Sequence, residues 1–196
     1  KTTTAFLMET ILAAAGHAPG VIGTVAYRYA GAREQARFTT PTPVVLQGVL
    51  GRMRARGCSH VIMEVSSHAL ELGRVHGCPF SVAAFTHLTQ DHLDLHGSME
   101  AYLEAKLRLF RHHLVPGGTA VVNLDGHGAG AVVAAVEARG DVALLGVSSQ
   151  GAPGAGLRLD DVRYSIDGLT GELRVRGAAP VPVASPLIGT FNGDNI

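Results

Sequence analysis

Apolar residues recur along the chain with two alternating spacings, one typical of helices and one typical of buried strands. The helical spacing predicts helices over residues 3–15, 43–57, 98–114 and 129–139. Short apolar blocks predict strands over residues 21–25, 60–65, 82–86, 119–123 and 142–146. Strands that alternate with helices indicate an α/β fold with a doubly wound, mostly parallel sheet.

Two of the strand blocks, at 60–65 and 82–86, have the pattern of strands buried on both faces of a parallel sheet. The segments 31–40 and 91–96 are polar and are expected to be loops. Ligands in such sheets bind at the carboxyl ends of the strands, and the polar residues of this chain gather at those ends.

The pattern changes after residue 151. Residues 157–164 and 172–176 alternate between apolar and polar side chains, and Asp167-Gly168 marks a turn between them. This predicts a β-hairpin at the sheet edge, near the C-terminal end of the chain.

Composition narrows the class of protein. A chain of 196 residues is long enough for one domain with a substantial core. Its 16 basic residues balance 16 acidic ones, which argues against a nucleic-acid or anionic-membrane partner. No apolar block approaches the roughly 20 residues of a membrane span. Cys58 and Cys78 do not have the spacing of a metal or redox site and are expected to be free thiols. We expect a soluble cytoplasmic protein.

The two ends suggest a piece of a longer enzyme. Lys1 opens the chain with no start methionine or targeting segment, and residues 191–196 have the pattern of a helix that has just begun. Lys1-Thr2-Thr3 before a helix is compatible with the end of a phosphate-binding loop, but an ordinary helix cap explains these residues equally well.

Glu64 ends an apolar strand block and precedes several small polar residues. Burial of a lone carboxylate is costly unless a cation pairs with it. A glutamate that faces solvent or pairs with an arginine is nearly as good an interpretation of Glu64. For Asp91 to His96 taken alone, an ordinary polar surface loop is a better interpretation than a metal site. Together, however, the two segments make a shared Mg²⁺ site reasonable, since Mg²⁺ prefers oxygen ligands.

Lys106 falls on the apolar side of its predicted helix. Tyr102, Leu103 and Phe110 define that side, and the advance of about 100° per residue puts Lys106 near its middle. Either the lysine stem packs while the ammonium reaches water, or the side chain is functional, with its ammonium facing phosphates or its charge changed by modification.

Several motifs, taken in order, resemble the central domain of the Mur ligases. They are Lys1-Thr2-Thr3-Thr4, Thr39-Thr40-Pro41, Met63 to Leu70 with Gly73-Arg74-Val75, Asp91-His92-Leu93-Asp94, Tyr102 with Glu104-Ala105-Lys106, and Gly189 with Phe191-Asn192 and Asn195. The chain is most similar to the members that add meso-diaminopimelate or L-lysine to UDP-N-acetylmuramoyl-L-alanyl-D-glutamate. His87 and Leu72 differ from residues common in the family.

The resemblance implies a P-loop type of sheet and an ATP-dependent amide synthesis in peptidoglycan formation, with ATP and Mg²⁺ as cofactors and a monomeric enzyme. It implies these roles: Lys1 and Lys106 in catalysis; Lys1, Thr2, Thr3, Asn192 and Asn195 in ATP binding; Thr39, Thr40, Ser66 and Arg74 in binding the UDP-muramoyl-dipeptide; and Thr2, Glu64, His92 and Lys106 in metal binding. In this family the lysine that Lys106 matches is carbamylated, which turns an ammonium into a carboxylate.

Three alternatives remain. Folylpolyglutamate synthases and cyanophycin synthetases share the phosphate loop and the modified lysine, although residues 64–70 fit them less well. The chain is also compatible with a nucleotide-binding module that has no ligase activity. A P-loop kinase would need an acceptor-binding lid, for which the sequence gives no sign. The choice of added amino acid is expected to lie in a C-terminal domain.

Overall fold

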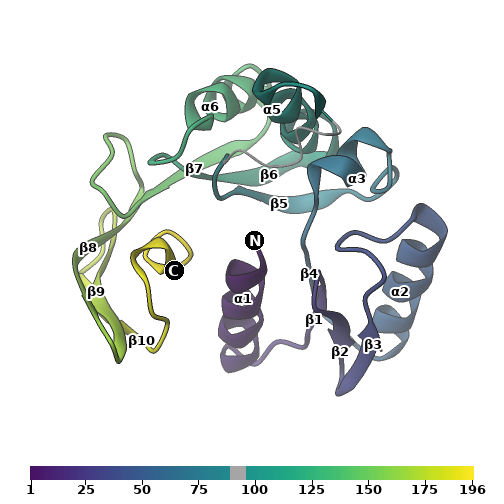
Figure 1. The fold of residues 1–196 in the computed structure, drawn as a ribbon, viewed down its shortest axis with the longest axis horizontal. Helices are drawn as coiled ribbons and strands as arrows, with labels where there is room; N and C mark the ends of the chain where they lie inside the picture. Colours follow the sequence, from purple (N-terminus) through teal and green to yellow (C-terminus); the bar gives the residue numbers. More distant parts are fainter. Residues whose placement is uncertain (89–95) are drawn as a thin grey trace. The chain divides into compact units, whose positions relative to one another are not determined.

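The computed structural model describes residues 1–88 and 96–196, and these form two compact units, Lys1–Cys78 and Pro79–Ile196 (Figure 1). Each unit has its own sheet and its own helices.

The first unit contains a four-stranded mixed sheet in the order β3-β2-β1-β4. Its strands are β1 (Pro19–Ile22), β2 (Ala26–Tyr29), β3 (Ala32–Gln35) and β4 (His60–Met63), and its helices are α1 (Thr2–Ala14), α2 (Pro43–Ala55) and α3 (Ser67–Glu71). β1 and β4 are parallel, with Ile22 beside Met63, so their carboxyl ends lie together.

The alternation of β1 explains why helices cover both faces of this sheet (Figure 1). Val21 packs with Ala5 of α1 and Ile62 of β4 in one small buried cluster. Gly20 points the other way, and a Cβ atom there would lie 3.0 Å from Met53 Sδ on α2. The missing side chain of Gly20 therefore lets α2 approach the sheet closely.

Two predictions for this unit are wrong. The expected loop at 31–40 contains β3, because Ala30 and Gly31 both take positive φ angles and turn the chain back on β2. The expected strand at 21–25 ends at Ile22, where the chain leaves the sheet and the backbone N–H of Thr24 bonds to Glu64 instead.

The second unit contains a six-stranded sheet in the order β10-β9-β8-β7-β6-β5. Its strands are β5 (Phe80–Phe85), β6 (Leu114–Asn123), β7 (Ala143–Ser148), β8 (Leu157–Ser165), β9 (Gly168–Val175) and β10 (Val181–Ser185). Its helices are α5 (Met99–Arg108), the π-helix η1 (Leu109–His113), α6 (Ala129–Glu137) and the short 3-10 helix η2 (Thr190–Asn192). Strands β5 to β8 are parallel neighbours, whereas β8, β9 and β10 are antiparallel.

The core of this unit lies between β5, β6 and the helices α5 and α6, which cover the same face of the sheet (Figure 1). Phe110, Val122, Val132 and Val136 are at most 1% exposed there. Full burial of a side chain of this size stabilises the folded state by about 1.5–3 kcal/mol. This packing holds the carboxyl ends of β5 and β6 in place, through Phe85 and Val122.

The predicted helix at 98–114 begins as expected, with the Ser98 hydroxyl accepting from the N–H of Ala101. It ends differently: α5 stops at Arg108, a π-helical turn follows, and Leu114 already belongs to β6. The guanidinium of Arg139 donates to the carbonyls of Phe110 and Leu114, so it satisfies acceptors that a longer helix would have bonded itself.

The predicted α/β class is confirmed, with a mostly parallel second sheet. The hairpin near the C-terminal end is confirmed as β8 and β9, and β10 extends it. Burial on both faces is wrong for the blocks at 60–65 and 82–86, where Val61 is 40% and Val82 is 50% exposed. None of the described helices is both long enough and apolar enough to cross a membrane.

Candidate functional site

The carboxylate of Glu64 lies at the carboxyl end of β4 and is 4% exposed. Three donors hold it: the Thr2 hydroxyl at 2.8 Å, the Thr24 N–H at 3.0 Å and the Thr24 hydroxyl at 3.3 Å. All three donors are neutral groups, and hydrogen bonds of this kind offset part of the cost of burying a carboxylate. Of the two interpretations that the sequence left open, burial at a strand end is the one that the structure shows.

Gly23 and Thr24 complete this arrangement, and the sequence reasoning missed both. A Cβ atom at Gly23 would lie 2.2 Å from Glu64 Oε1, so only glycine lets the carboxylate sit where it does. Thr24 also contacts Thr39, with 3.0 Å between the two hydroxyl oxygens. The available signal was the Gly-Thr pair within the predicted strand at 21–25, since a glycine inside a strand often marks a close approach of the backbone to another group.

The oxygens around Glu64 fit a magnesium ion. Two neighbouring ligands of an octahedral Mg²⁺ lie about 3.0 Å apart, given bonds of about 2.1 Å. Thr2 Oγ1 and Glu64 Oε2 are 2.8 Å apart and need little movement to share such an ion. Among the described residues there is no group of three or more His, Cys, Asp or Glu that could hold a metal. Mg²⁺ commonly takes substrate phosphate and water oxygens as its remaining ligands.

Lys1 and Thr2 begin α1, a helix of 13 residues. Lys1 is exposed at the N-cap position, and its carbonyl accepts from the N–H of Ala5 at 2.9 Å. The first N–H groups of a helix have no partner within it and favour an anion. Thr3 lies in this same first turn, so the predicted ATP-binding residues at the start of the chain adjoin Glu64 through Thr2.

Thr39, Thr40, Ser66 and Arg74 lie within one hydrogen-bonded group next to Glu64. The Thr40 hydroxyl is fully buried, donates to the Glu64 carbonyl at 2.8 Å and accepts from the Ser66 N–H at 3.1 Å. Arg74 donates to the Thr40 carbonyl at 3.1 Å. Thr40 is thus engaged with the backbone on both sides and holds the segment together.

Unlike the Thr40 hydroxyl, the side chains of Ser66 and Arg74 keep hydrogen-bond donors that a ligand could use. The Ser66 hydroxyl accepts from the Ala69 N–H at 3.1 Å and caps α3, but a hydroxyl in that position still carries a proton to donate. The guanidinium of Arg74 lies 4.7 Å from the ring centroid of Phe38, and Phe38 is held by a 2.9 Å bond from Tyr27 to its carbonyl. Burial raises the pKa of Tyr27, which keeps this donor protonated.

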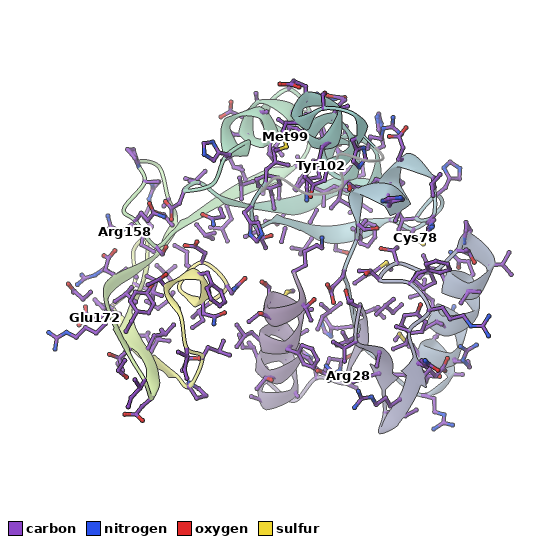
Figure 2. All side chains as sticks on the ribbon, in the orientation of Figure 1. Arg28, Cys78, Met99, Tyr102, Arg158 and Glu172 are labelled. Carbon is purple, nitrogen blue, oxygen red and sulfur yellow. The ribbon has the colours of Figure 1, made fainter. Side chains whose placement is uncertain are left out.

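In the second unit, Lys106 is half-buried on α5. Its Nζ lies 4.8 Å from the ring centroid of Tyr102, which packs into the core beneath the helix (Figure 2). Glu100 and Glu104 of the same helix are exposed, as the predicted apolar side requires. The predicted position of Lys106 on that side is confirmed.

Asn192 and Asn195 lie together in the C-terminal turn of the second unit. Asn192 is buried, and its amide donates to the Ile188 carbonyl at 2.8 Å. Asn195 donates to Asn192 Oδ1 at 3.0 Å and to the Phe191 carbonyl at 3.1 Å. The two amides therefore support each other's orientation.

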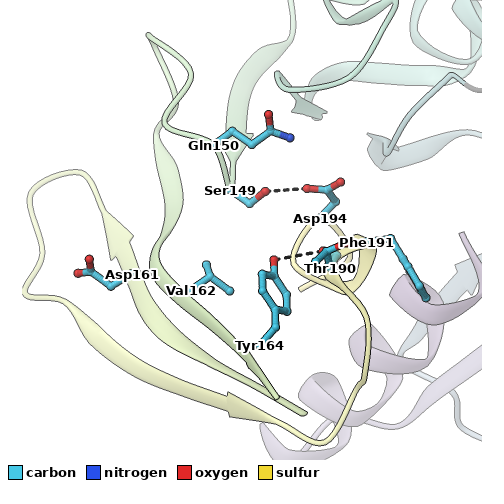
Figure 3. Close-up of a pocket in the computed structure, with 8 residues that line it drawn as sticks. All are labelled: Ser149, Gln150, Asp161, Val162, Tyr164, Thr190, Phe191 and Asp194. Carbon is cyan, nitrogen blue, oxygen red and sulfur yellow. Dashed lines mark hydrogen bonds between the residues drawn. The ribbon is translucent and has the colours of Figure 1, made fainter. Parts of the chain in front are cut away.

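A polar pocket of about 560 Å³ adjoins this turn (Figure 3). It is lined by Ser149, Gln150, Asp161, Val162, Tyr164, Thr190, Phe191 and Asp194.

Of the remaining predicted site residues, His92 falls outside the described residues. Cys58 and Cys78 are free, as expected, and burial raises the pKa of both thiols.

The sequence pattern of the family described as "Mur ligase middle domain" matches residues 1–196, which is the whole chain. The chain belongs to the Mur ligase family. Both compact units of the chain fall within the matched region.

Relatives with assigned names include the UDP-N-acetylmuramoyl-L-alanyl-D-glutamate--2,6-diaminopimelate ligase of Geobacter metallireducens, which is 43% identical over 201 residues. That comparison covers 100% of this chain and 38% of the relative. The enzyme of the same name from Corynebacterium glutamicum is 53% identical over 111 residues, covering 57% of this chain and 22% of the relative. The chain thus spans about 38% of the length of the relatives that match it completely.

Solved structures agree with this membership. A structure of a UDP-N-acetylmuramoyl-L-alanyl-D-glutamate--2,6-diaminopimelate ligase superposes with a TM-score of 0.89 at 32% identity, covering 100% of this chain and 39% of that one. MurF from Acinetobacter baumannii gives a TM-score of 0.71 at 17% identity, covering 99% and 38%, and so supports the fold alone. The predicted resemblance to the Mur ligases is confirmed.

Proposed function

We propose that the protein containing this chain forms an amide bond with ATP, adding the third amino acid to UDP-N-acetylmuramoyl-L-alanyl-D-glutamate in peptidoglycan synthesis. The observation that carries the proposal is the buried Glu64 carboxylate, 2.8 Å from the Thr2 hydroxyl at the start of α1. The names of relatives at 41–43% identity support the substrate and favour diaminopimelate over L-lysine.

The chemistry has to bring a carboxylate onto a triphosphate. In the proposed reaction the D-glutamyl carboxylate attacks the γ-phosphorus, ADP leaves, and the amine of the incoming amino acid then displaces phosphate from the acyl phosphate. Mg²⁺ would supply positive charge where negative charge develops. Glu64 and Thr2 would hold that ion, and Lys1 and the first N–H groups of α1 would bind the phosphates.

The group around Thr40 suits the other substrate. Arg74 can bind an anionic group, and the Phe38 ring beneath it limits where its guanidinium points. Thr39 and Ser66 would donate hydroxyl bonds, while Thr40, already bonded to the backbone on both sides, would fix their spacing.

The second unit carries the remaining expectations. We propose that Asn192 and Asn195 recognise the adenine and that Lys106 acts as a carbamate, as the family resemblance implies. His92 as a metal ligand, a monomeric state and a cytoplasmic location stay predictions.

Two other functions have less support. A folylpolyglutamate synthase structure has a TM-score of 0.70 but 16% identity, so it shares the fold alone. A nucleotide-binding module without ligase activity would need no group like Arg74 and Ser66 beside Glu64.

The test is product formation by the full-length protein. ADP, phosphate and the UDP-muramoyl-tripeptide should appear in equal amounts, and each should require ATP, the UDP-muramoyl-dipeptide and diaminopimelate together. L-Lysine in place of diaminopimelate is the matched comparison. ATP hydrolysis that is independent of the dipeptide, or glutamate added to a folate, would overturn the proposal.

A further inference from the structure

Asp125 connects the ends of two neighbouring strands in the second unit. It follows β6, where the Asn123 side chain accepts from its N–H at 3.0 Å. Its carboxylate accepts from the Ser148 hydroxyl at 2.6 Å and from the N–H groups of Ser149 and Gln150 at 2.7 and 3.2 Å. Asn123 and Ser148 are buried, so this loop is held from inside the unit.

Two hydroxyl groups tie the C-terminal turn to this framework (Figure 3). Ser149 donates to Asp194 at 2.6 Å, and Tyr164 of β8 donates to the Thr190 carbonyl at 3.1 Å. Gly193 lies between these two attachment points, and a Cβ atom there would be 2.3 Å from the Tyr164 oxygen. Partial burial, and then the charge of Asp194, raise the pKa of Tyr164, so the phenol stays protonated and able to donate.

Besides these two bonds, the turn is held by bonds among its own residues, such as those of Asn192 to the Ile188 carbonyl and of Asn195 to Asn192. Its helical part, η2, is three residues long, and Phe191 is 66% exposed. Isolated turns of this length are not stable by themselves, because one or two hydrogen bonds do not offset the loss of backbone entropy. The contacts made by Ser149 and Tyr164 therefore matter for where Asn192 and Asn195 lie.

We propose that Ser149, held by Asp125, and Tyr164 are positioning residues that pre-order the Asn192–Asn195 turn for the base of the nucleotide. The inference rests on the proposed function, because it takes the ligand of that turn to be ATP. A turn that is ordered before binding loses less entropy when the ligand arrives, and so binds it more tightly.

Kinetics of the full-length enzyme test the inference. Ser149→Ala and Tyr164→Phe each remove one tether without adding bulk. Each should raise KM for ATP about fivefold to tenfold, the range for one hydrogen bond, while kcat and KM for the UDP-muramoyl-dipeptide change less than about twofold. Ser149→Thr, which keeps the hydroxyl, should restore KM. Ser165→Ala is the matched control, since that hydroxyl serves the β8–β9 turn and should leave KM for ATP unchanged.

A double-mutant cycle sharpens the result. If Ser149 acts through Asp194, then Ser149→Ala combined with Asp194→Ala should raise KM for ATP no more than either change alone. Independent, multiplying effects would overturn the proposed link. Unchanged KM for ATP in both single variants, or equal losses for every substrate with a lowered Tm, would overturn the inference while leaving the ligase function intact. A wild-type enzyme that uses no ATP would instead overturn the proposed function.

Discussion

Replacing Glu64 by glutamine separates the charge of this side chain from its role in packing. The substitution keeps the shape. The Gln oxygen can still accept from the Thr24 N–H, and its amide can donate to the Thr2 hydroxyl, which rotates to accept. Buried donors are therefore not left without acceptors, as they would be in Glu64→Ala.

The expected effects on stability and on activity differ widely. Bonds to a carboxylate are worth about 1.5–3 kcal/mol each, against several kcal/mol for burying the charge, so the two nearly cancel and the free energy of unfolding should change by about 1 kcal/mol or less. Loss of a charge that stabilises the transition state costs about 2.7–4 kcal/mol, or about 10²–10³ in kcat.

The assay is phosphate release by the full-length enzyme over a range of Mg²⁺ concentrations, with Tm measured alongside. We expect kcat to fall by that factor and to recover partly at high Mg²⁺, with Tm shifted by a few degrees at most. Glu9→Gln is the matched control, because Glu9 lies about two turns beyond Thr2 in α1 and pairs with Arg28. A Glu64→Gln enzyme with kcat within threefold of wild type would refute the metal-binding role.

Three further predictions concern other parts of the chain. Gly23→Ala should lower the free energy of unfolding by about 1–3 kcal/mol and should also lower kcat, because the new methyl group displaces the Glu64 carboxylate. Gly51→Ala, where a methyl group meets open space, should lower neither. Equal unfolding curves for the two variants would count against the close contact at Gly23. Lys106→Ala should be folded and inactive, with activity partly restored by short carboxylic acids; a fully active variant would remove Lys106 from the proposed site. Arg52, and then Tyr29, hold the pKa of Glu34 below its usual 4.5, so their contribution to stability is present above that pH and is lost as pH falls through the lowered pKa; urea titrations of wild type and Glu34→Gln should therefore converge as pH falls below 4.5, and a constant difference would contradict this.

Sequence patterns predicted the helices because burial imposes their periodicity, as the buried Leu46, Val49 and Met53 on one side of α2 illustrate. They did not predict β3, because its pairing depends on the positive φ angles of Ala30 and Gly31 and not on apolar side chains. The end of α5 depended on Arg139, 29 residues away from the carbonyl of Phe110 that it caps.

In the candidate site, too, some residues could be predicted from the sequence and others could not. Glu64 could be identified because a carboxylate after an apolar strand conflicts with its surroundings. Gly23 and Thr24 gave a weaker signal, since their importance arises from the parallel pairing of β1 with β4. The tether between Ser149 and Asp194 joins residues 45 positions apart and has no local pattern at all.

The most direct test of the account follows the oxygen atoms of the substrate. The full-length enzyme would be given UDP-muramoyl-dipeptide with ¹⁸O in the γ-carboxylate of its D-glutamate, together with ATP, Mg²⁺ and diaminopimelate, and the phosphate would be analysed by mass spectrometry. If that carboxylate is activated by attack on ATP, each phosphate released during amide formation carries one ¹⁸O atom. Phosphate that contains no ¹⁸O, formed while the tripeptide accumulates, would contradict the account.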